Sequence, residues 1–472
     1  MIFSPEEGEC ETGRGGAGVL AIMPVMYPEM GQTLIWHSLS LTQRARARRW
    51  AMASVLLLYT ALAACDPGTK PGDRIELVLW KNQAGREEDA QTTAQIDQFN
   101  AKQSRWRIVP QFLPQGGYDQ SIVAASLAGR MPCILAVDSP MVASYAWAGH
   151  IRPLDGYVAT GTLAAVSPSA VGHYAGRIYA AGQFDAALAI FTRRSILAQM
   201  RMRIPTLDHP WSGEEFQTLL ERLKASGIYR YPLDLGTRDD KASWWTYAFS
   251  PILQSFGGDL IDRRSMTSAQ GALNGEAAQR FGNWFQALFA KGLVNRQEPD
   301  ENAFVRGRAA LVYTGDWAAP AYRTYAGADL LVLPPPDFGH GVVIGGGSWQ
   351  WAISKACSHP EGAGAFIDFM LQDRQVAAMS DATGNVPVTE GGASASRDFG
   401  PRGNSRMFFD LMRRFARPRP ATPAFSVVAN AYTFAMRDIM DGKDVQDAFD
   451  DAVDDIDQTI ADHHAYRTGG HP

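Results

Sequence analysis

The sequence predicts an α/β protein in which mostly parallel sheets are flanked by helices. Short apolar segments with strand character alternate with helical segments of ten or more residues, which is the pattern of β-α-β units. A parallel sheet is covered by helices on both faces, so its strands are apolar throughout. The composition is that of a globular protein, because 46% of the 472 residues are apolar and 20% are charged. This length predicts about two or three domains.

The first elements follow the alternation in order. The predicted strands are 75–80, 107–112 and 133–137, and the predicted helices are 87–100 and 118–127. A polar turn beginning at Gly85 separates the first strand from the first helix, and Gly129 stops the second helix. Asp138 directly follows the third strand. These elements predict the start of a sheet whose strand ends carry polar residues.

Three later segments carry the apolar stripe of an amphipathic helix, because their apolar residues recur at helical spacing. These segments are 281–289, 363–371 and 445–460. The last of them has a run of aspartates on its reverse side. That run lacks the glycine-containing loop spacing of a calcium site, so a solvated helix face is predicted there.

The beginning of the chain has the layout of a secretory signal. A basic cluster from Arg44 to Arg49 precedes an apolar run that is too short to span a bilayer of roughly 30 Å. The run ends in Leu-Ala-Ala before Cys65, which resembles a bacterial lipobox. We expect residues 1–64 to be a cleaved leader, Cys65 to be lipidated, and 65–73 to be a linker. The alternative is a buried N-terminal helix that happens to end in cysteine.

Composition and motifs argue against several classes of function. The chain has 44 Lys and Arg against 49 Asp and Glu, a net charge of −5, without the basic stripe of a nucleic-acid-binding protein. Its four cysteines form no C-x-x-C pair, so no zinc or thioredoxin-like site is predicted. No cofactor or metal is expected, and catalytic signatures such as H-E-x-x-H and G-x-S-x-G do not occur. A binding protein is therefore favoured over an enzyme.

A series of short motifs runs along the chain after the leader. Among them are Gly129-x-x-Pro132, Gly149-His150-Ile151-Arg152-Pro153-Leu154-Asp155, Phe304-x-x-Gly307-Arg308, Gly315-Asp316-Trp317, Gly345-Gly346-Gly347, Thr383-Gly384-x-x-Pro387 and Arg419-Pro420-x-x-Pro423. In order and spacing this series resembles the family 1 extracellular solute-binding proteins of ABC sugar importers, over essentially the whole mature length. Cys133 departs from the family, which usually has an aspartate there. Whether Cys133 pairs with Cys357 is a matter of geometry.

The resemblance implies a two-lobe periplasmic-binding-protein fold of type II. The lobes would be 74–184 plus 349–385 and 185–345 plus 386–472, joined by segments that cross between them. The ligand would lie between the lobes, outside the carboxyl ends of the strands, and hinge closure would capture it. The implied partners are ABC permease transmembrane subunits with a cytoplasmic ATPase. A lipid anchor at Cys65 would hold the exported protein at the periplasmic face of the inner membrane.

Acids and amides near strand ends are expected to bind sugar hydroxyls. A carboxylate accepts two hydroxyl hydrogens in charge-assisted bonds, which are stronger than neutral ones. In the trehalose- and maltose-type members that the chain resembles, the positions matching Glu87, Asp138 and Asp185 bind sugar hydroxyls. Gln83 in the first turn is a further candidate, and Glu88 is the alternative register for Glu87.

Aromatic residues are expected to cover the C–H faces of the sugar, since flat rings bury those faces with little loss of side-chain entropy. Trp317 matches the family's stacking residue in the second lobe, and Trp349 directly follows the glycine motif. The neighbouring residues Trp244 and Trp245 begin a predicted helix. We expect Trp245 to contact the ligand, with packing in the helix core as the alternative.

Two glycines and an arginine complete the expected site. Gly346 and Gly347 would let the backbone approach the ligand closely, and Arg419 would donate to hydroxyls. Three carboxylates in one cleft would repel phosphate or carboxylate groups, so the expected ligand is a neutral oligosaccharide, with a disaccharide such as trehalose or maltose favoured. The alternative function is a secreted lipoprotein glycoside hydrolase that uses Asp138 and Asp185 as its acid pair.

Overall fold

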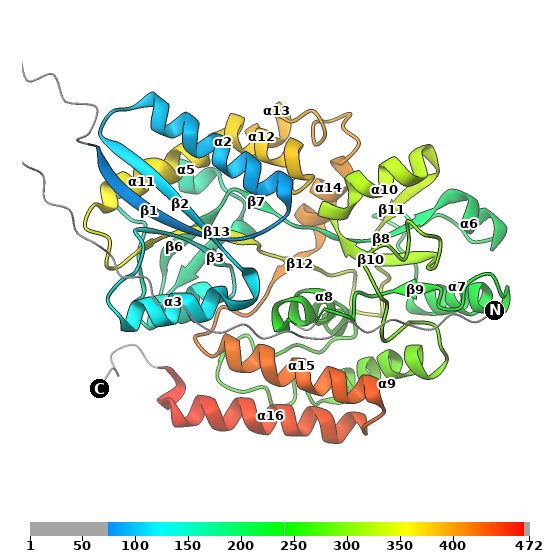
Figure 1. Ribbon diagram of the computed structural model, residues 1–472. Helices are drawn as coiled ribbons and strands as arrows, with labels where there is room; N and C mark the ends of the chain where they lie inside the picture. Colours follow the sequence, from blue (N-terminus) through cyan, green and yellow to red (C-terminus); the bar gives the residue numbers. More distant parts are fainter. Residues whose placement is uncertain (1–73, 240, 467–472) are drawn as a thin grey trace, which may run out of the picture. The chain divides into compact units, whose positions relative to one another are not determined.

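The computed structural model describes residues 74–239 and 241–466. The predicted leader 1–64, the lipidation site at Cys65 and the linker 65–73 lie outside the described residues. The described elements belong to one compact unit, Asp73–Pro472. Within this unit strands and helices alternate along the chain, as the sequence predicts (Figure 1).

The first sheet formed by the described residues has seven strands, in the order β2-β1-β3-β13-β6-β5, with β4 paired to β13. Its strands are β1 (Ile75–Asn82), β2 (Trp106–Leu113), β3 (Ile134–Asp138), β4 (Ile151–Arg152), β5 (Val171–Tyr174), β6 (Arg177–Gly182) and β13 (Trp349–Ser354). β1 is parallel to β2 and β3, whereas β13 is antiparallel to β3 and β6. The sheet is therefore mixed and not mostly parallel, because β13 returns to it from the second sheet and runs opposite to β3.

The second sheet, again counted over the described residues, has four strands in the order β11-β8-β10-β9. Its strands are β8 (Leu188–Arg193), β9 (Leu233–Asp234), β10 (Leu311–Gly315) and β11 (Leu330–Leu333). Two short strand pairs accompany the passages between the sheets: β7 (Phe184–Asp185) pairs with β14 (Val386–Pro387), and β12 (Ile344–Gly346) pairs with β15 (Ala416–Pro418). We call these two pairs the crossover, because β7 leads from β6 into β8 and β12 leads back into β13.

Helices surround both sheets. The helices in the first half of the described chain are α2 (Arg86–Lys102), α3 (Tyr118–Leu127), α4 (Met141–Trp147), α5 (Thr160–Ala165), α6 (Arg194–Gln199), α7 (Gly213–Ala225) and α8 (Ala242–Ser255). The later ones are α9 (Glu276–Ala290), α10 (Ala319–Ala326), α11 (Pro360–Met370), α12 (Asp373–Thr383), α13 (Glu390–Ala395), α14 (Arg406–Phe415), α15 (Phe425–Asp441) and α16 (Val445–Asp462). The predicted helices at the start of the fold are α2 and α3, and the three predicted stripes belong to α9, α11 and α16.

The first sheet is buried on both faces because alternate residues of a strand point to opposite sides. In β3, Ile134 and Ala136 join the core that contains residues of α2 and α11. Leu135 and Val137 join a separate core that contains residues of α3 and α4. The apolar part of β3, residues 134–137, therefore lies between two helical layers. Its last residue, Asp138, is polar and lies at the carboxyl end of the strand.

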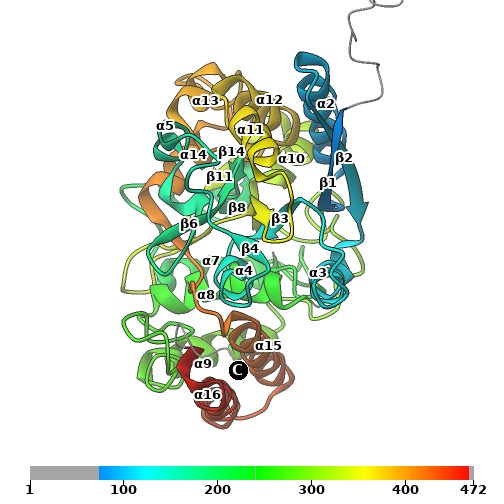
Figure 2. The same ribbon diagram turned by 90° about the vertical axis from the view of Figure 1, so that its left-hand side faces the viewer.

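The last helices pack on the second sheet's side of the molecule. α15 contacts α8, α9 and α16, and Figure 2 shows α9, α15 and α16 side by side. Phe281 and Phe285 of α9 and Val453 and Ile456 of α16 are fully or almost fully buried in the same core. On the reverse side of α16 four of the six predicted aspartates are exposed: Asp447, Asp451, Asp454 and Asp455. Asp450 and Asp457 are half-buried, and they accept hydrogen bonds from Asn274 and Ser268. The solvated helix face is thus confirmed for four of the six.

A disulfide joins Cys133 to Cys357 and resolves the pairing that the sequence leaves open. It ties the start of β3 to the segment that follows β13, so it reinforces the first sheet at two neighbouring strands. In the described part of the chain, no helix combines the length and apolar character needed to cross a membrane.

Candidate ligand-binding site

A cavity of about 590 Å³ lies where the first sheet, the second sheet and the crossover meet. We call it the ligand cavity. Its lining comes from the carboxyl ends of β1 and β3, the start of β13, the helix α8 and the turn after β10. The lining residues are Asn82, Gln83, Ala84, Gly85, Glu87, Glu88, Gln115, Asp138, Phe184, Ala186, Asp239, Lys241, Ser243, Trp244, Tyr247, Glu301, Trp317, Gly347, Ser348, Trp349, Thr383, Asn385 and Arg419. Ligands of α/β proteins bind at such strand ends.

The first-sheet wall is mostly polar. Gln83 and Glu87 are both exposed at the end of β1 and the start of α2, as the sequence predicts for this turn. Glu87 forms no ion pair with any residue that the structure describes. Asn82 was missed by the sequence analysis: it is 1% exposed, and its amide nitrogen and oxygen have no hydrogen-bond partner within the described chain. Buried amides are rarely left unpaired, so Asn82 is free to bind a ligand hydroxyl.

Lys81 determines which of the two neighbouring carboxylates, Glu87 or Glu88, is available to a ligand. Lys81 is buried in β1, and its Nζ lies 2.7 Å from Glu88 Oε1 and 3.1 Å from Asp89 Oδ1. A buried ammonium needs such partners because burying an unpaired charge is costly. Glu88 is therefore engaged in an ion pair, and Glu87 is the carboxylate of this helix that remains available to a ligand.

Asp138 and Arg419 form a bidentate ion pair across the cavity wall. Arg419 Nη2 donates to Asp138 Oδ1 at 2.7 Å, and Arg419 Nη1 donates to Asp138 Oδ2 at 3.1 Å. The guanidinium also lies over the ring of Tyr247, 5.3 Å from its centroid. Both groups are largely removed from water, so the pair is stronger than a surface salt bridge. Each of these two predicted ligand residues thus already has the other as a partner.

The second wall carries three aromatic residues, Trp244, Tyr247 and Trp317, beside polar residues such as Lys241 and Glu301, and we call these three side chains the aromatic wall. Trp317 follows β10 in the 3₁₀ turn η3 (Asp316–Ala318) and is 43% exposed. Its ring contacts Trp244 edge-on at 6.4 Å and lies tilted against Tyr247 at 6.3 Å. A Cβ on Gly315 would lie 1.9 Å from the Trp317 ring, so the indole lies across the backbone of a residue that has no side chain. The absence of a Cβ at Gly315 allows Trp317 to take this position.

Trp349 belongs to the first-sheet wall and is half-buried. It starts β13 opposite Asp138 in the antiparallel register and packs edge-on against Tyr118 at 5.6 Å. Gly347, two residues earlier, has a φ of +86°, a conformation that favours glycine, and a Cβ there would come within 2.3 Å of Ser139 Oγ. Gly347 thus packs closely against Ser139, and because it also lines the cavity, its close approach to a ligand stays a prediction.

Asp185 does not line the ligand cavity. It is 1% exposed, and its Oδ1 accepts hydrogen bonds from the N–H groups of Ala186 at 2.8 Å and Gly347 at 3.0 Å. Burial raises the pKa of Asp185 to about 6, and the neighbouring Ser169 hydroxyl and the two N–H groups offset part of this effect. Its observed contacts join two segments of the crossover, because β7 and the residue after β12 meet at this carboxylate.

Two further predicted site residues also lie elsewhere. Trp245 is completely buried against Phe249 and Phe285, and its indole N–H donates to the Asp239 carbonyl at 2.7 Å. One residue along an α-helix rotates the side chain by about 100°. The same helix therefore points Trp244 into the cavity and Trp245 into the core. Gly346 is buried within the β12–β15 pair, opposite Pro418, and not at the cavity surface.

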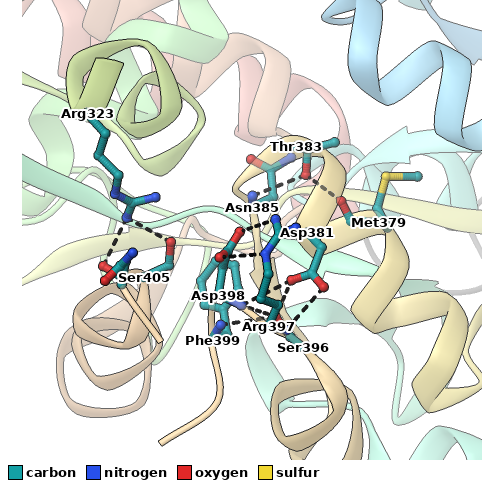
Figure 3. Close-up of polar contacts among 11 residues, drawn as sticks. Arg323, Met379, Asp381, Thr383, Asn385, Ser396, Arg397, Asp398, Phe399 and Ser405 are labelled. Atoms are coloured by element: carbon teal, nitrogen blue, oxygen red, sulfur yellow. Dashed lines mark hydrogen bonds and ion pairs between the residues drawn. The ribbon is translucent and has the colours of Figure 1, made fainter. Parts of the chain in front are cut away.

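The turn after α12 adds polar residues that sequence reasoning missed. Thr383 and Asn385 line the cavity, and the Asn385 N–H donates to Thr383 Oγ1 at 3.1 Å. The Asn385 Oδ1 is buried and has no partner among the residues described. Figure 3 shows how this turn is held, with Thr383 Oγ1 accepting from the Asn385 N–H and donating to the Met379 carbonyl at 2.9 Å. The motif Thr-Gly-x-x-Pro was the signal available in the sequence, since Asn385 occupies one of its unspecified positions.

Asp316 holds the turn that carries Trp317. It is fully buried, accepts from the N–H of Trp317 at 3.0 Å through Oδ1, and accepts from the N–H of Val386 at 3.0 Å through Oδ2. Burial raises the pKa of Asp316 well above its ordinary value. One carboxyl group thus joins the turn that carries Trp317 to strand β14 of the crossover.

Together these features define a two-lobe α/β protein with a polar and aromatic cavity between its sheets. The family of bacterial extracellular solute-binding proteins matches residues 84–377, more than half of the chain. The chain belongs to this family. Its members bind solutes and are not enzymes, and the acid pair of the alternative function is not assembled here, because Asp138 is paired with Arg419 and Asp185 lies outside the cavity.

Individual relatives agree with the family assignment. The chain is 24% identical over 262 residues to the maltodextrin-binding protein MdxE of Bacillus subtilis. The matched region is 52% of this chain and about three fifths (61%) of that protein. It is 23% identical over 370 residues to an uncharacterized lipoprotein of Streptomyces antibioticus, covering 74% and 77% of the two chains. The cyclic alpha-maltosyl-1,6-maltose binding protein of Arthrobacter globiformis has the same fold, with a TM-score of 0.69, 20% identity, and coverage of 82% of this chain and 100% of that one.

Proposed function

We propose that this protein is the substrate-binding lipoprotein of an ABC importer and captures a neutral oligosaccharide of the maltose type. The observation that carries the proposal is the opposition of a polar wall and an aromatic wall across the ligand cavity. The two lobes that close on the sugar would be 74–184 plus 349–385 and 185–345 plus 386–472. Permease transmembrane subunits with a cytoplasmic ATPase would then take up the sugar.

The chemistry of the two walls matches the chemistry of a sugar. Hydroxyl groups at the sugar rim need donors and acceptors, which Asn82, Gln83 and Glu87 supply from one side. The C–H faces need flat apolar surfaces, which Trp317 and Trp244 supply from the other side. Small-molecule sites generally combine aromatic walls with a few polar groups that fix orientation.

The charge of the cavity favours a neutral ligand, although the reason differs from the one expected from the sequence. Two of the three expected carboxylates are unavailable, because Asp138 is paired with Arg419 and Asp185 lies elsewhere. Among residues 74–239 and 241–466, however, five acidic residues and two basic residues line the cavity. Four of these acids form ion pairs with described lysine or arginine side chains, which leaves Glu87 as the lining carboxylate without an ion pair in the described chain. An anionic sugar phosphate would meet this unpaired charge, so it is disfavoured.

The relatives support maltodextrin over trehalose as the starting hypothesis. The names of the Bacillus subtilis and Arthrobacter globiformis proteins refer to maltose-based oligosaccharides. The cavity volume of about 590 Å³ lies within the range of about 300–1,000 Å³ that is usual for small-molecule sites.

Export and anchoring are part of the proposal. The disulfide between Cys133 and Cys357 suits an oxidising compartment outside the cytoplasm. The Streptomyces antibioticus relative is named as a lipoprotein. We propose that Cys65 carries the lipid and holds the protein at the membrane, on the periplasmic face of the inner membrane if the cell has two membranes. Mass spectrometry of the membrane-bound protein and of Cys65→Ser tests this, and an unmodified Cys65 in the wild type would contradict it.

Isothermal titration calorimetry tests the proposed ligand. We expect one maltose or maltotriose molecule to bind per chain with micromolar affinity, which corresponds to about 8 kcal/mol. The control ligand is a sugar phosphate of similar size. Binding of the phosphate together with no heat from any neutral oligosaccharide would reject the proposal.

A further inference from the structure

A second cavity of about 510 Å³ lies beside the crossover and shares no described lining residue with the ligand cavity. We call it the crossover cavity. Its lining includes Ser169, Asp185, Val388, Phe409, Met412 and Pro418. We propose that the crossover cavity is a separate binding site for a small organic ammonium ion with an apolar body.

The carboxylate of Asp185 supplies the recognition group. Its Oδ1 accepts from the two N–H groups of Ala186 and Gly347, whereas its Oδ2 is buried and forms no hydrogen bond with any described residue. The Ser169 hydroxyl is close to the carboxyl group but does not reach hydrogen-bonding geometry with Oδ2. A carboxylate has about four acceptor positions, and buried acceptors are rarely left unused. An N⁺–H group is the donor that would complete this site.

The charges around the cavity favour a cation. Arg413, which also lines it, donates to Glu390 Oε1 at 2.5 Å, so these two rim charges neutralise each other. Arg419 reaches Asp185 only through its electric field, because its guanidinium is bound to Asp138. The negative charge of Asp185 is therefore left for a ligand, and an anion in the cavity would be repelled.

The walls define the rest of the ligand. Phe409 and Met412 are buried side chains of α14, and Val388 and Pro418 add further apolar surface from the crossover segments. Apolar walls with a single charged group are the usual composition of a small-molecule site, and the volume lies within the usual range. A compact aromatic or branched body that carries one primary ammonium group fits this description.

The site is connected to the ligand cavity through Gly347. Its N–H donates to Asp185 Oδ1, its carbonyl lies 3.4 Å from Arg419 Nη2, and the residue itself lines the ligand cavity. A cation bound at Asp185 thus acts on the segment that carries Gly347. In this respect the inference rests on the proposed function: the cation and the oligosaccharide would change each other's affinity by the same factor.

The test is a ¹⁹F NMR titration of the purified protein with 4-fluorobenzylammonium, with no sugar present. The neutral analogue 4-fluorobenzyl alcohol is the matched control ligand. We expect saturable binding of the ammonium, and we expect Asp185→Asn to weaken it about tenfold or more while changing the alcohol's affinity little. The Asn variant keeps the Oδ1 acceptor for both N–H groups, so the crossover bonds are retained.

A second variant, Met412→Trp, fills the cavity without touching the carboxylate and is expected to abolish binding of both probes. Absence of saturable ammonium binding below about 10 mM in the wild type would overturn the inference. So would binding that neither variant weakens. Because no sugar is present, these results are independent of the ligand cavity. A later titration with maltotriose then tests the coupling, and failure of maltotriose to bind would reject the proposed function while leaving the ammonium site standing.

Discussion

The two walls of the ligand cavity differ in how their side chains are held. On the first-sheet wall, Asn82 has no hydrogen-bond partner and Glu87 no ion pair among the described residues, so they are available to a ligand. On the second wall, Trp317 is fixed by ring contacts with Trp244 and Tyr247 and by the backbone of Gly315. One wall thus offers free polar groups, and the other offers a rigid apolar surface.

This difference implies a division of labour. A surface that is already rigid loses little entropy when a sugar ring covers it, so the aromatic wall contributes mainly to affinity. Polar groups without partners lose nothing within the protein when they bind hydroxyls, so the polar wall contributes mainly to the choice of sugar. The ion pair between Asp138 and Arg419 connects the walls and belongs to the fold more than to the ligand.

The largest expected effect is the loss of stability when the ion pair between Asp138 and Arg419 is broken. Arg419→Met leaves Asp138 partly buried without its partner, and breaking a buried ion pair on one side costs about 3–5 kcal/mol. We expect chemical denaturation to show a loss of stability of this order. The matched control is Arg177→Met, which removes an exposed partner of Asp155 and is expected to cost less than about 1 kcal/mol. Equal effects of the two substitutions would contradict a structural role for the buried pair.

The next largest expected effect is a pH-dependent change in stability caused by Asp185 in the crossover. The folded pKa of Asp185 is about 6, above its ordinary value of 3.8, so the folded state holds the proton more tightly than the unfolded state. Stability from the protonated carboxyl is therefore present at low pH and is lost as the pH rises from about 4 to about 6.

Asp185→Asn does not titrate and keeps the Oδ1 acceptor. We expect it to be more stable than the wild type by about 2–3 kcal/mol above pH 6, with the difference shrinking towards pH 4. Thermal melting at several pH values measures this difference. A gain that is the same at every pH would show that the charge of Asp185 is not its cause.

The aromatic wall is expected to dominate binding. Trp317→Ala removes the rigid surface, and loss of a central tryptophan typically costs about 2 kcal/mol or more, equivalent to about a 30-fold weaker affinity for maltotriose. Phe434→Ala is the control, because Phe434 is an exposed aromatic residue (65% exposed) that does not line the cavity. Calorimetry of both variants decides the matter. If Trp317→Ala binds as well as Phe434→Ala, the wall has no role in binding.

Loss of a polar-wall residue is expected to weaken the affinity for maltotriose less than loss of Trp317 does. Asn82→Leu removes an amide that has no partner in the described structure, so the fold should be as stable as before or more stable. The affinity for maltotriose should nevertheless fall about tenfold, because the hydroxyl bonds are lost. The melting temperature should therefore stay the same or rise, while the affinity measured by calorimetry falls. A loss of stability with unchanged affinity would assign Asn82 to the fold and not to the ligand.

The sequence predicted the class of fold and much of the cavity, and the exceptions have physical causes. The alternation of strand-like and helical segments located α2 and α3, and periodicity located α9, α11 and α16 because their apolar stripes face a core. It did not reveal that β13 runs antiparallel to β3, since strand direction depends on the path of the chain between sheets. Neither did it reveal Asn82, because an asparagine at a strand end is also typical of an ordinary turn.

Neighbouring residues with the same chemistry were the hardest to assign. Trp244 and Trp245 differ by one helical step, and only the packing of Phe249 and Phe285 decides which indole is buried. Pairing between distant residues was equally invisible, since Asp138 and Arg419 are far apart in the sequence. Candidate residues in turns could be located from the sequence, but their partners required three-dimensional contacts.

The most direct test of this account is a crystal structure of the protein with maltotriose. The account predicts one sugar ring stacked on Trp317, with hydroxyls bonded to Asn82 and Glu87 on the opposite wall, and with the ion pair between Asp138 and Arg419 intact. A sugar that contacts only one wall, or that binds outside the ligand cavity, would contradict it.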